Sequence, residues 1–234
     1  MQTDQHPAIQ SGSLQDGIAA PYDFAVMDII KEAWQRTSGL KGPVLGAFSV
    51  IFITLMSISF VVIFFIDISN TQDSSLVSLF AMSLNIIISI LSYPIFAGIL
   101  MMGLHRSIDA PVNFKMAFAY LSNALPVIIA CVFISILVTL GMILLVIPGI
   151  YLSIAYVFTL PLIIDKNMDF WQAMETSRKA VTQHWFKVFF SFLLMMIIYL
   201  VSIIPFGVGL IWSVPMLVAL QGILYRNIFG IESH

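Results

Sequence analysis

The few polar residues that could do chemistry include one pair with the spacing of a metal site. His105 and Asp109 are four residues apart, which would place both side chains on one face of a helix. Imidazole nitrogen and carboxylate oxygen are both common metal ligands. Arg106, however, lies between them, and its guanidinium would repel a cation. We therefore predict no metal site, and we interpret His105 and the isolated His184 as interfacial or solvated histidines.

A second group of ionisable residues mixes acids with bases. It consists of Asp165, Asp169 and Glu175 together with Lys166, Arg178 and Lys179. Helix capping and ion pairing explain this group better than acid and base catalysis, because each acid has a base within a few residues. Cys131 has no nearby histidine or basic residue to activate it, so we expect it to pack as a small apolar side chain. The sequence thus predicts a protein that is not an enzyme and uses no cofactor. An intramembrane enzyme using His105, Asp165 and His184 is the least favoured alternative.

The elements that carry these residues follow from a very apolar composition. Of the 234 residues, 60% are hydrophobic and 9% are charged, and the mean hydropathy is +1.01. Soluble domains contain about 25% charged residues. The net charge of −2 gives no reason to expect a nucleic-acid partner, and the single cysteine excludes an intrachain disulfide. The composition indicates an all-α integral membrane protein.

Six segments are apolar and long enough to cross a membrane as helices, which takes about 20 residues. They are residues 43–66, 76–104, 125–146, 150–164, 188–205 and 208–225. The fourth is short, and we expect it to begin before Pro148. Short connections at 147–149 and 205–207 and a longer polar loop at 67–75 would then lie on the same side of the membrane.

The orientation follows from the basic residues. Six spans place all ten lysines and arginines on the side opposite the three loops, whose only charges are Asp67 and Asp73. By the positive-inside rule the basic side is cytoplasmic, so we predict that both termini are cytoplasmic. Residues 1–22 are polar and lack the basic and apolar regions of a secretory signal. We predict a flexible cytoplasmic tail there, followed by a membrane domain over residues 23–234.

Each predicted hairpin of two spans is preceded by a short amphipathic segment. In the first segment Val26, Ile29, Ile30 and Ala33 share one face. Residues 170–183 show the same periodicity, and residues 113–121 show a weaker one. Such helices suit the headgroup plane, because they are too short and polar to span. We predict three units in parallel topology, approximately 23–106, 107–166 and 167–234, each a surface helix followed by a transmembrane hairpin.

Two groups of residues are candidates for a functional role. Basic and tryptophan residues near the predicted cytoplasmic interface could contact lipid headgroups: Lys31, Trp34, Arg36, Arg106, Lys115, Arg178, Lys179, Trp185 and Lys187. Prolines in the second span of each unit, Pro94, Pro161 and Pro215, predict kinks that free backbone carbonyls. Together with Asn85 they could line a central cavity, although simple packing of kinked helices is the favoured explanation.

One stretch resembles a known group of bacterial membrane proteins. It reads Ile147-Pro148-Gly149-Ile150, then Pro161, Asp165, Phe170, Ala173 and Ser177, then Trp185 at the start of the next span. This pattern resembles the YciC-like inner-membrane proteins and the membrane domain that precedes the catalytic barrel in some glycerophosphoryl diester phosphodiesterases. The resemblance implies a six-span module in the bacterial inner membrane. It implies no phosphodiesterase activity, because a catalytic barrel would need about 200 further residues.

These observations favour a non-enzymatic inner-membrane protein that interacts with lipids or serves envelope homeostasis. Its expected partners are membrane lipids, and it could form a homo-oligomer or be a subunit of a membrane complex. The predicted spans contain no ionisable residue, which disfavours coupling to protons or sodium ions. A channel or transporter for a small neutral or amphiphilic solute is the alternative.

Overall fold

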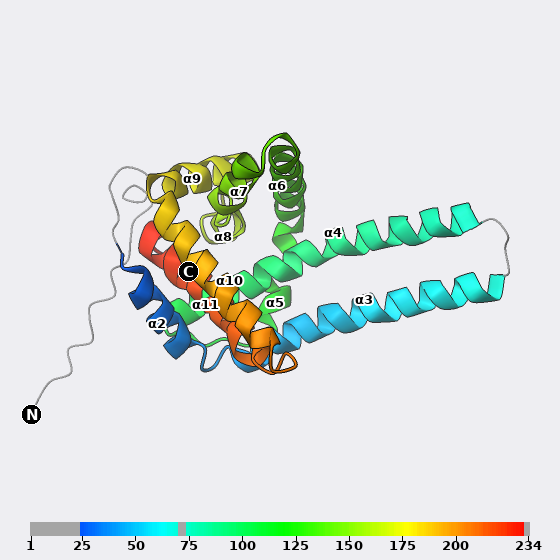
Figure 1. The fold of residues 1–234 in the computed structure, drawn as a ribbon, viewed down its shortest axis with the longest axis horizontal. Coiled ribbons are helices and arrows are strands. Elements are labelled where there is room, and N and C mark those ends of the chain that lie inside the picture. The colour runs from blue at the N-terminus through cyan, green and yellow to red at the C-terminus, as the bar shows by residue number, and fades with distance from the viewer. Residues whose placement is uncertain (1–23, 70–73, 232–234) are drawn as a thin grey trace, which may run out of the picture.

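The computed structural model describes residues 24–69 and 74–231, and all regular structure within these ranges is helical (Figure 1). The elements are α2 (Val26–Arg36), α3 (Lys41–Ser69), α4 (Ser74–Ser107), α5 (Met116–Ala119), a 3-10 turn (Leu121–Asn123), α6 (Ala124–Leu144), α7 (Val146–Ala155), α8 (Thr159–Asp165), α9 (Phe170–Gln183), α10 (Trp185–Ile203) and α11 (Leu210–Phe229). The predicted all-α class is confirmed for these residues. The predicted tail, residues 1–22, lies outside them.

Five helical segments of the described chain are long and apolar enough to cross a membrane. They are Lys41–Val61, Met82–Ser107, Leu121–Leu144, Val146–Asp165 and Trp185–Ile203. These segments correspond to the first five predicted spans. Their length and composition indicate a multi-pass membrane protein.

The sixth predicted span, residues 208–225, overlaps α11. This helix is not among the five, because Gln221, Arg226 and Asn227 lower its hydropathy. Fourteen of its 20 residues are buried by the surrounding helices. A helix enclosed by protein can carry polar residues that a helix facing lipid cannot. The count of six spans is therefore not confirmed.

The three hairpins point in different directions. The α3–α4 hairpin projects far from the remaining helices, which form a compact body, whereas the α6–α7 and α10–α11 turns lie at other sides of that body (Figure 1). The outer part of the α3–α4 hairpin exposes apolar side chains such as Phe52, Phe60 and Leu91. The division into three parallel units with all loops on one side is not confirmed and stays a prediction.

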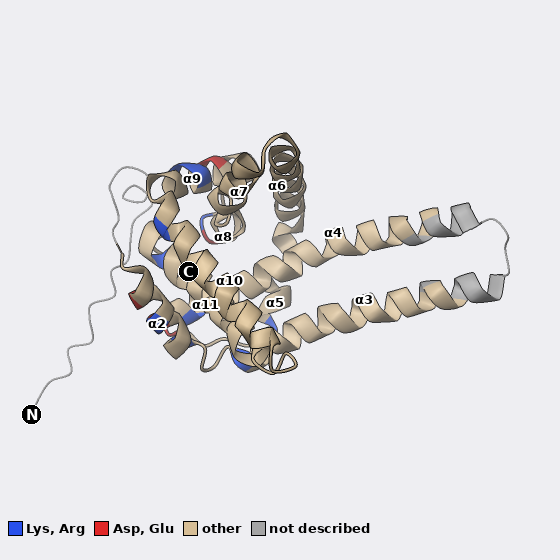
Figure 2. Cartoon of the chain, viewed as in Figure 1, with Lys and Arg blue, Asp and Glu red and all other residues tan. Residues whose placement is uncertain are grey.

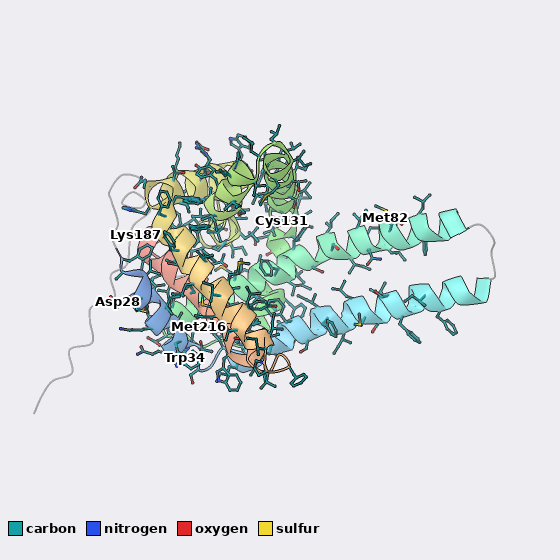
Figure 3. All side chains as sticks on the ribbon, in the orientation of Figure 1. Asp28, Trp34, Met82, Cys131, Lys187 and Met216 are labelled. Carbon is teal, nitrogen blue, oxygen red and sulfur yellow. The ribbon has the colours of Figure 1, made fainter. Side chains whose placement is uncertain are left out.

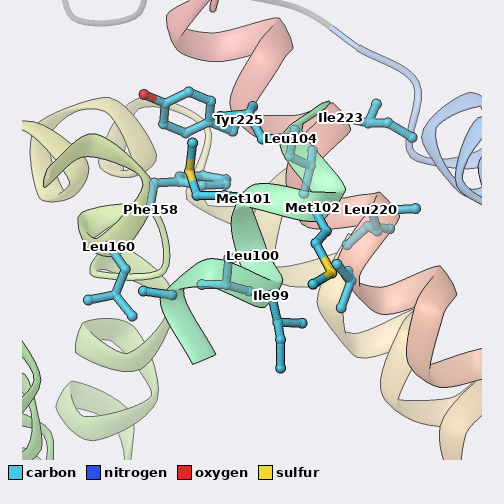
Figure 4. Packing of buried hydrophobic residues seen from close by; sticks show 14 of the residues in the cluster. Ile99, Leu100, Met101, Met102, Leu104, Phe158, Leu160, Leu220, Ile223 and Tyr225 are labelled. Carbon is cyan, nitrogen blue, oxygen red and sulfur yellow. The ribbon is translucent and has the colours of Figure 1, made fainter. Parts of the chain in front are cut away.

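The centre of the body is the crossing of α4 and α11. A Cβ atom at Gly103 would overlap the carbonyl oxygen of Val218, and one at Gly222 would overlap the carbonyl oxygen of Gly103. The two backbones therefore meet through glycines, as small residues permit between membrane helices. Around this crossing pack buried side chains of α4, α8 and α11, among them Met102, Leu160 and Leu220 (Figure 4).

Substitution at this crossing should separate the two helices. We expect Gly103→Ala to lower the free energy of unfolding by about 1–3 kcal/mol or more, the usual cost of overpacking a core. The measurement is thermal unfolding of detergent-solubilised protein. Gly42→Ala is the control, because a Cβ at Gly42 meets no atom within 4 Å. Equal stability of the two variants would show that the close approach does not exist.

Candidate functional site

The basic side chains gather on the compact body. Figure 2 shows lysine and arginine on α2, on the inner ends of α3 and α4, and around α8 to α11, while the described outer part of the α3–α4 hairpin carries none. Most of the predicted headgroup residues are within this region. They divide into a buried arginine network, an exposed groove beside α2, and a cluster on α9 and α10.

The arginine network is centred on Arg226 of α11, a residue that is only 4% exposed. Its guanidinium donates two hydrogen bonds to Glu32 of α2, from Nη1 to Oε1 at 2.9 Å and from Nη2 to Oε2 at 3.1 Å. Nη1 also donates to the carbonyl oxygen of Ser107 at the end of α4, and Nη2 donates to Asn227 Oδ1. One buried cation thus ties α2 and α4 to α11.

Arg36 extends the network along α2. Its Nε donates to Glu32 Oε1 at 2.7 Å, and its Nη1 donates to the carbonyl oxygen of Arg106 at 2.9 Å. The same Nη1 lies 2.7 Å from Asp109 Oδ1, and Arg106 Nη1 lies 3.8 Å from that oxygen. The last carbonyl groups of a helix carry partial negative charge. Arg36 and Arg226 therefore both neutralise the end of α4.

The network sets the ionisation of its acids. Burial disfavours the charged form of Glu32, but hydrogen bonds from Arg226 and Arg36 outweigh this effect and lower its pKa. The hydrogen bond from Arg36 likewise lowers the pKa of Asp109. Both acids stay ionised at neutral pH, so the cluster holds three guanidinium groups against two carboxylates.

A groove lies on the other side of α2, between this helix, α10 and α11. It has a volume of about 390 Å³ and is lined by Ile30, Lys31, Trp34, Gln35, Ile198 and Met216. Trp34 and Met216 lie close together in Figure 3. Trp34 is 58% exposed, and the exposed Lys31 forms no ion pair with any described residue. The groove thus combines an apolar floor with the exposed Lys31 and an indole at its rim.

The predicted headgroup residues on α9 and α10 form a separate cluster. Arg178 and Lys179 both pair with Glu175, at 2.8 and 3.3 Å, on an exposed surface. Trp185 stacks on Phe189 with ring centroids 4.8 Å apart. These two rings, with Ile147, Ile150 and Tyr151, line a second pocket of about 280 Å³. Lys187 is half-buried on α10, and Lys115 is exposed beside α5.

The predicted kinks take different forms. Pro94 and Pro215 lie inside α4 and α11, and Asn85 is exposed on the outer part of α4. Pro161 instead lies in the first turn of α8, after a break at residues 156–158 that separates α8 from α7. None of the three prolines lines either of the two pockets described above.

Side chains from two other helices close the break between α7 and α8. Ser177 Oγ donates to the carbonyl oxygen of Ala155 at 2.7 Å and accepts from the Phe158 amide at 3.2 Å. Gln221 Nε2 donates to the carbonyl oxygen of Val157 at 2.8 Å. That carbonyl lies four residues before Pro161 and has no helical N–H to accept from. The break therefore presents no unsatisfied group at these positions.

The candidate chemical residues have structural partners. Asp165 is 4% exposed, accepts a hydrogen bond from Tyr225 Oη at 2.8 Å and lies 3.5 Å from Lys166 Nζ. Asp169 caps α9 by accepting from the Trp171 amide. His105 Nδ1 lies 2.9 Å from the carbonyl oxygen of Met101. The predicted capping and ion pairing of the carboxylates are thus present. In the part of the chain that the structure describes, no three metal-ligating side chains come together.

Sequence reasoning missed Glu32 and Arg226 as members of one cluster. The spacing of Glu32 and Arg36 indicates an ion pair on α2, but the partner on α11 lies 194 residues away. A signal did exist, because Arg226 directly follows the last apolar segment, residues 208–225. A charged residue at the end of a membrane-spanning segment requires a partner.

Comparisons with known proteins give no match. No family model matches the chain, and neither a curated protein nor a solved structure does. The resemblance to YciC-like proteins and to the phosphodiesterase membrane domain thus stays a prediction.

The side-chain closure of the α7–α8 break can be tested at Ser177. Ser177→Ala leaves the Phe158 amide and the Ala155 carbonyl without this partner, so we expect a loss of about 1–3 kcal/mol in the free energy of unfolding. Ser153→Ala is the matched control, because Ser153 is exposed and bonds only to the carbonyl of Ile150 in its own helix. Thermal unfolding of both variants is the measurement. A loss no larger than that of the control would contradict the assignment.

The arginine network predicts a pH dependence of stability. Because the pKa of Glu32 is lowered on folding, its contribution is complete above its unfolded pKa and disappears as the pH falls through its folded pKa. We expect the thermal midpoint to fall as the pH drops below the ordinary glutamate pKa of 4.5, and to fall less in Glu32→Gln. Glu175→Gln is the control, because the exposed pairs of Glu175 contribute only about 0–1 kcal/mol. Identical pH profiles for wild type and Glu32→Gln would refute the role of Glu32.

Proposed function

We propose that the protein is a non-enzymatic multi-pass membrane protein that binds phospholipid in the groove between α2 and α10. The observation that carries this proposal is the combination of groups in that groove. Its floor is formed by Ile30, Ile198 and Met216, and Lys31 and Trp34 stand at its rim. An apolar floor suits an acyl chain, and a lysine suits a phosphate.

The position of the groove supports this reading. α2 buries Ile29, Ile30 and Ala33 and carries its charges on the remaining faces, as expected for a helix in the headgroup plane. α10 is one of the five helices apolar enough to cross the membrane. Trp34 stands beside the groove, and tryptophan favours the level of the bilayer where headgroups meet acyl chains.

The size of the groove limits what it holds. Its volume of about 390 Å³ is near the lower end of the range for small-molecule sites. It therefore accommodates one end of a lipid, the headgroup phosphate with the first part of an acyl chain. The rest of the lipid remains in the bilayer.

Transport is less well supported than lipid binding. A transporter of this kind would use a cavity lined by the helix-breaking prolines, but none of the three prolines lines either of the two described pockets. Transporters also use broken helices whose free backbone groups hold the solute. In the α7–α8 break Ser177 and Gln221 already occupy those groups.

The setting of this function is part of the proposal. We propose the bacterial inner membrane, with the basic side and both termini cytoplasmic, because all ten lysines and arginines lie on one side of the six predicted spans. A role in envelope homeostasis, alone or in a homo-oligomer or larger membrane complex, fits a lipid-binding protein for which we assign no catalytic residues.

The test is lipid retention in native nanodiscs containing phosphatidylglycerol and phosphatidylcholine, measured by quantitative mass spectrometry. We expect Lys31→Gln to lower the enrichment of phosphatidylglycerol about fivefold, because a lysine near an anionic lipid contributes about 1 kcal/mol. Lys115→Gln is the matched control, since Lys115 is also an exposed lysine with no ion pair among the described residues. Equal losses in both variants would show a general charge effect and would overturn the groove assignment.

A further inference from the structure

The end of α4 contains an acid where local structure disfavours one. The Asp109 amide donates to the carbonyl oxygen of Arg106, and the Ala110 amide donates to that of His105. These two hydrogen bonds form a Schellman motif, in which the residue at the Asp109 position is left-handed. Asp109 has φ = 59°. Glycine or asparagine is usual there, and a negative charge at a helix C-terminus is unfavourable.

Two arginines account for the acid at this position. Arg36 Nη1 lies 2.7 Å from Asp109 Oδ1, and Arg106 Nη1 lies 3.8 Å from the same atom. Two guanidinium groups from different helices thus converge on one carboxylate oxygen. Convergence of this kind is typical of protein sites for phosphate, which accepts several charge-assisted hydrogen bonds.

The exposed fractions of the Asp109, Arg36 and Arg106 side chains show which of the three can move away from this contact. The side chain of Asp109 is 63% exposed, whereas those of Arg36 and Arg106 are 14% and 27% exposed. Arg36 is held by Glu32 and by the carbonyl of Arg106, and Arg106 Nε donates to the carbonyl oxygen of Arg36. These hydrogen bonds therefore hold the two arginines in place, and the exposed carboxylate of Asp109 lies between them and the solvent.

We propose that Arg36 and Arg106 form a binding site for a phosphate group and that Asp109 occupies this site in the ligand-free protein. The ligand is the phosphate of an anionic phospholipid or a free phosphate anion. This site is distinct from the α2 groove, because Lys31 contributes nothing to it, and each site can be lost without the other.

Charge balance supports an anionic ligand. Glu32 is shared between Arg36 and Arg226, and Asp109 is shared between Arg36 and Arg106. The cluster keeps one excess positive charge while Asp109 is in place. A phosphate that displaces Asp109 brings at least the one negative charge that the carboxylate supplied. Phosphatidic acid offers the arginines one more terminal oxygen than the carboxylate, and free phosphate offers two more.

The experiment measures binding of phosphatidic acid to the full-length protein in detergent micelles by native mass spectrometry, with phosphatidylcholine as the reference lipid. Asp109→Asn removes the competing carboxylate, and asparagine suits the left-handed conformation, so this variant keeps the helix end intact. We expect its affinity for phosphatidic acid to rise at least about fivefold. The double variant Asp109→Asn/Arg106→Gln should lose that gain.

The control is Asp28→Asn, which makes the same change in net charge at an exposed acid of α2. An equal gain in this variant, or no gain in Asp109→Asn, would overturn the proposal. Competition with millimolar inorganic phosphate distinguishes the two sources of ligand. Displacement of the lipid from Asp109→Asn would assign the site to free phosphate, and retention of the lipid would assign it to a headgroup.

Discussion

The rest of the structure depends on one ion pair, between the buried Arg226 of α11 and the partly exposed Glu32 of α2. Arg226 is almost completely buried, and an unpaired charge in that position would cost several kcal/mol. Its two hydrogen bonds to Glu32 therefore hold α2 at one place on the body, and its bond to the Ser107 carbonyl holds the end of α4 there too. The groove at Lys31 and the arginine pair at Asp109 both exist because α2 is fixed in this way.

The Glu32–Arg226 ion pair and the crossing of α4 and α11 support each other. Gly103 and Gly222 let α4 and α11 approach closely, and this approach brings the ends of the two helices together. At those ends Arg226 meets the Ser107 carbonyl, and Arg36 meets the Arg106 carbonyl. Arg226 thus gives the Ser107 carbonyl a partner, and Arg36 adds a second hydrogen bond to the Arg106 carbonyl, which also accepts from the Asp109 amide. Both cations also suit the negative end of a helix.

Local patterns predicted the parts of this structure that depend on neighbouring residues. The apolar runs predicted six spans, and five helical segments long and apolar enough to span correspond to the first five. The periodicity of residues 26–33 predicted that Val26, Ile29, Ile30 and Ala33 share one face, and the last three are buried in the structure. Arg36 and Arg106 were identified as candidates from their type and position alone. Such inferences need only helical geometry and the cost of burying polar groups.

The remaining features depend on contacts between distant parts of the chain. The hydropathy of α11 indicated a sixth span, but 14 of its 20 residues are buried against other helices. The break at residues 156–158 is stabilised by Ser177 and Gln221, which no local pattern connects to it. Glu32 and Arg226 are likewise far apart in the sequence and meet only in the folded chain, so neither residue alone indicates the cluster.

The most direct test of the account is a double-mutant cycle between Glu32 and Arg226. The free energy of unfolding is measured for wild type, Glu32→Gln, Arg226→Gln and the double variant. The account predicts a coupling energy of about 2–3 kcal/mol, with the double variant less destabilised than the sum of the single ones. Additive effects within about 0.5 kcal/mol would contradict it, because they would show that the two side chains do not interact.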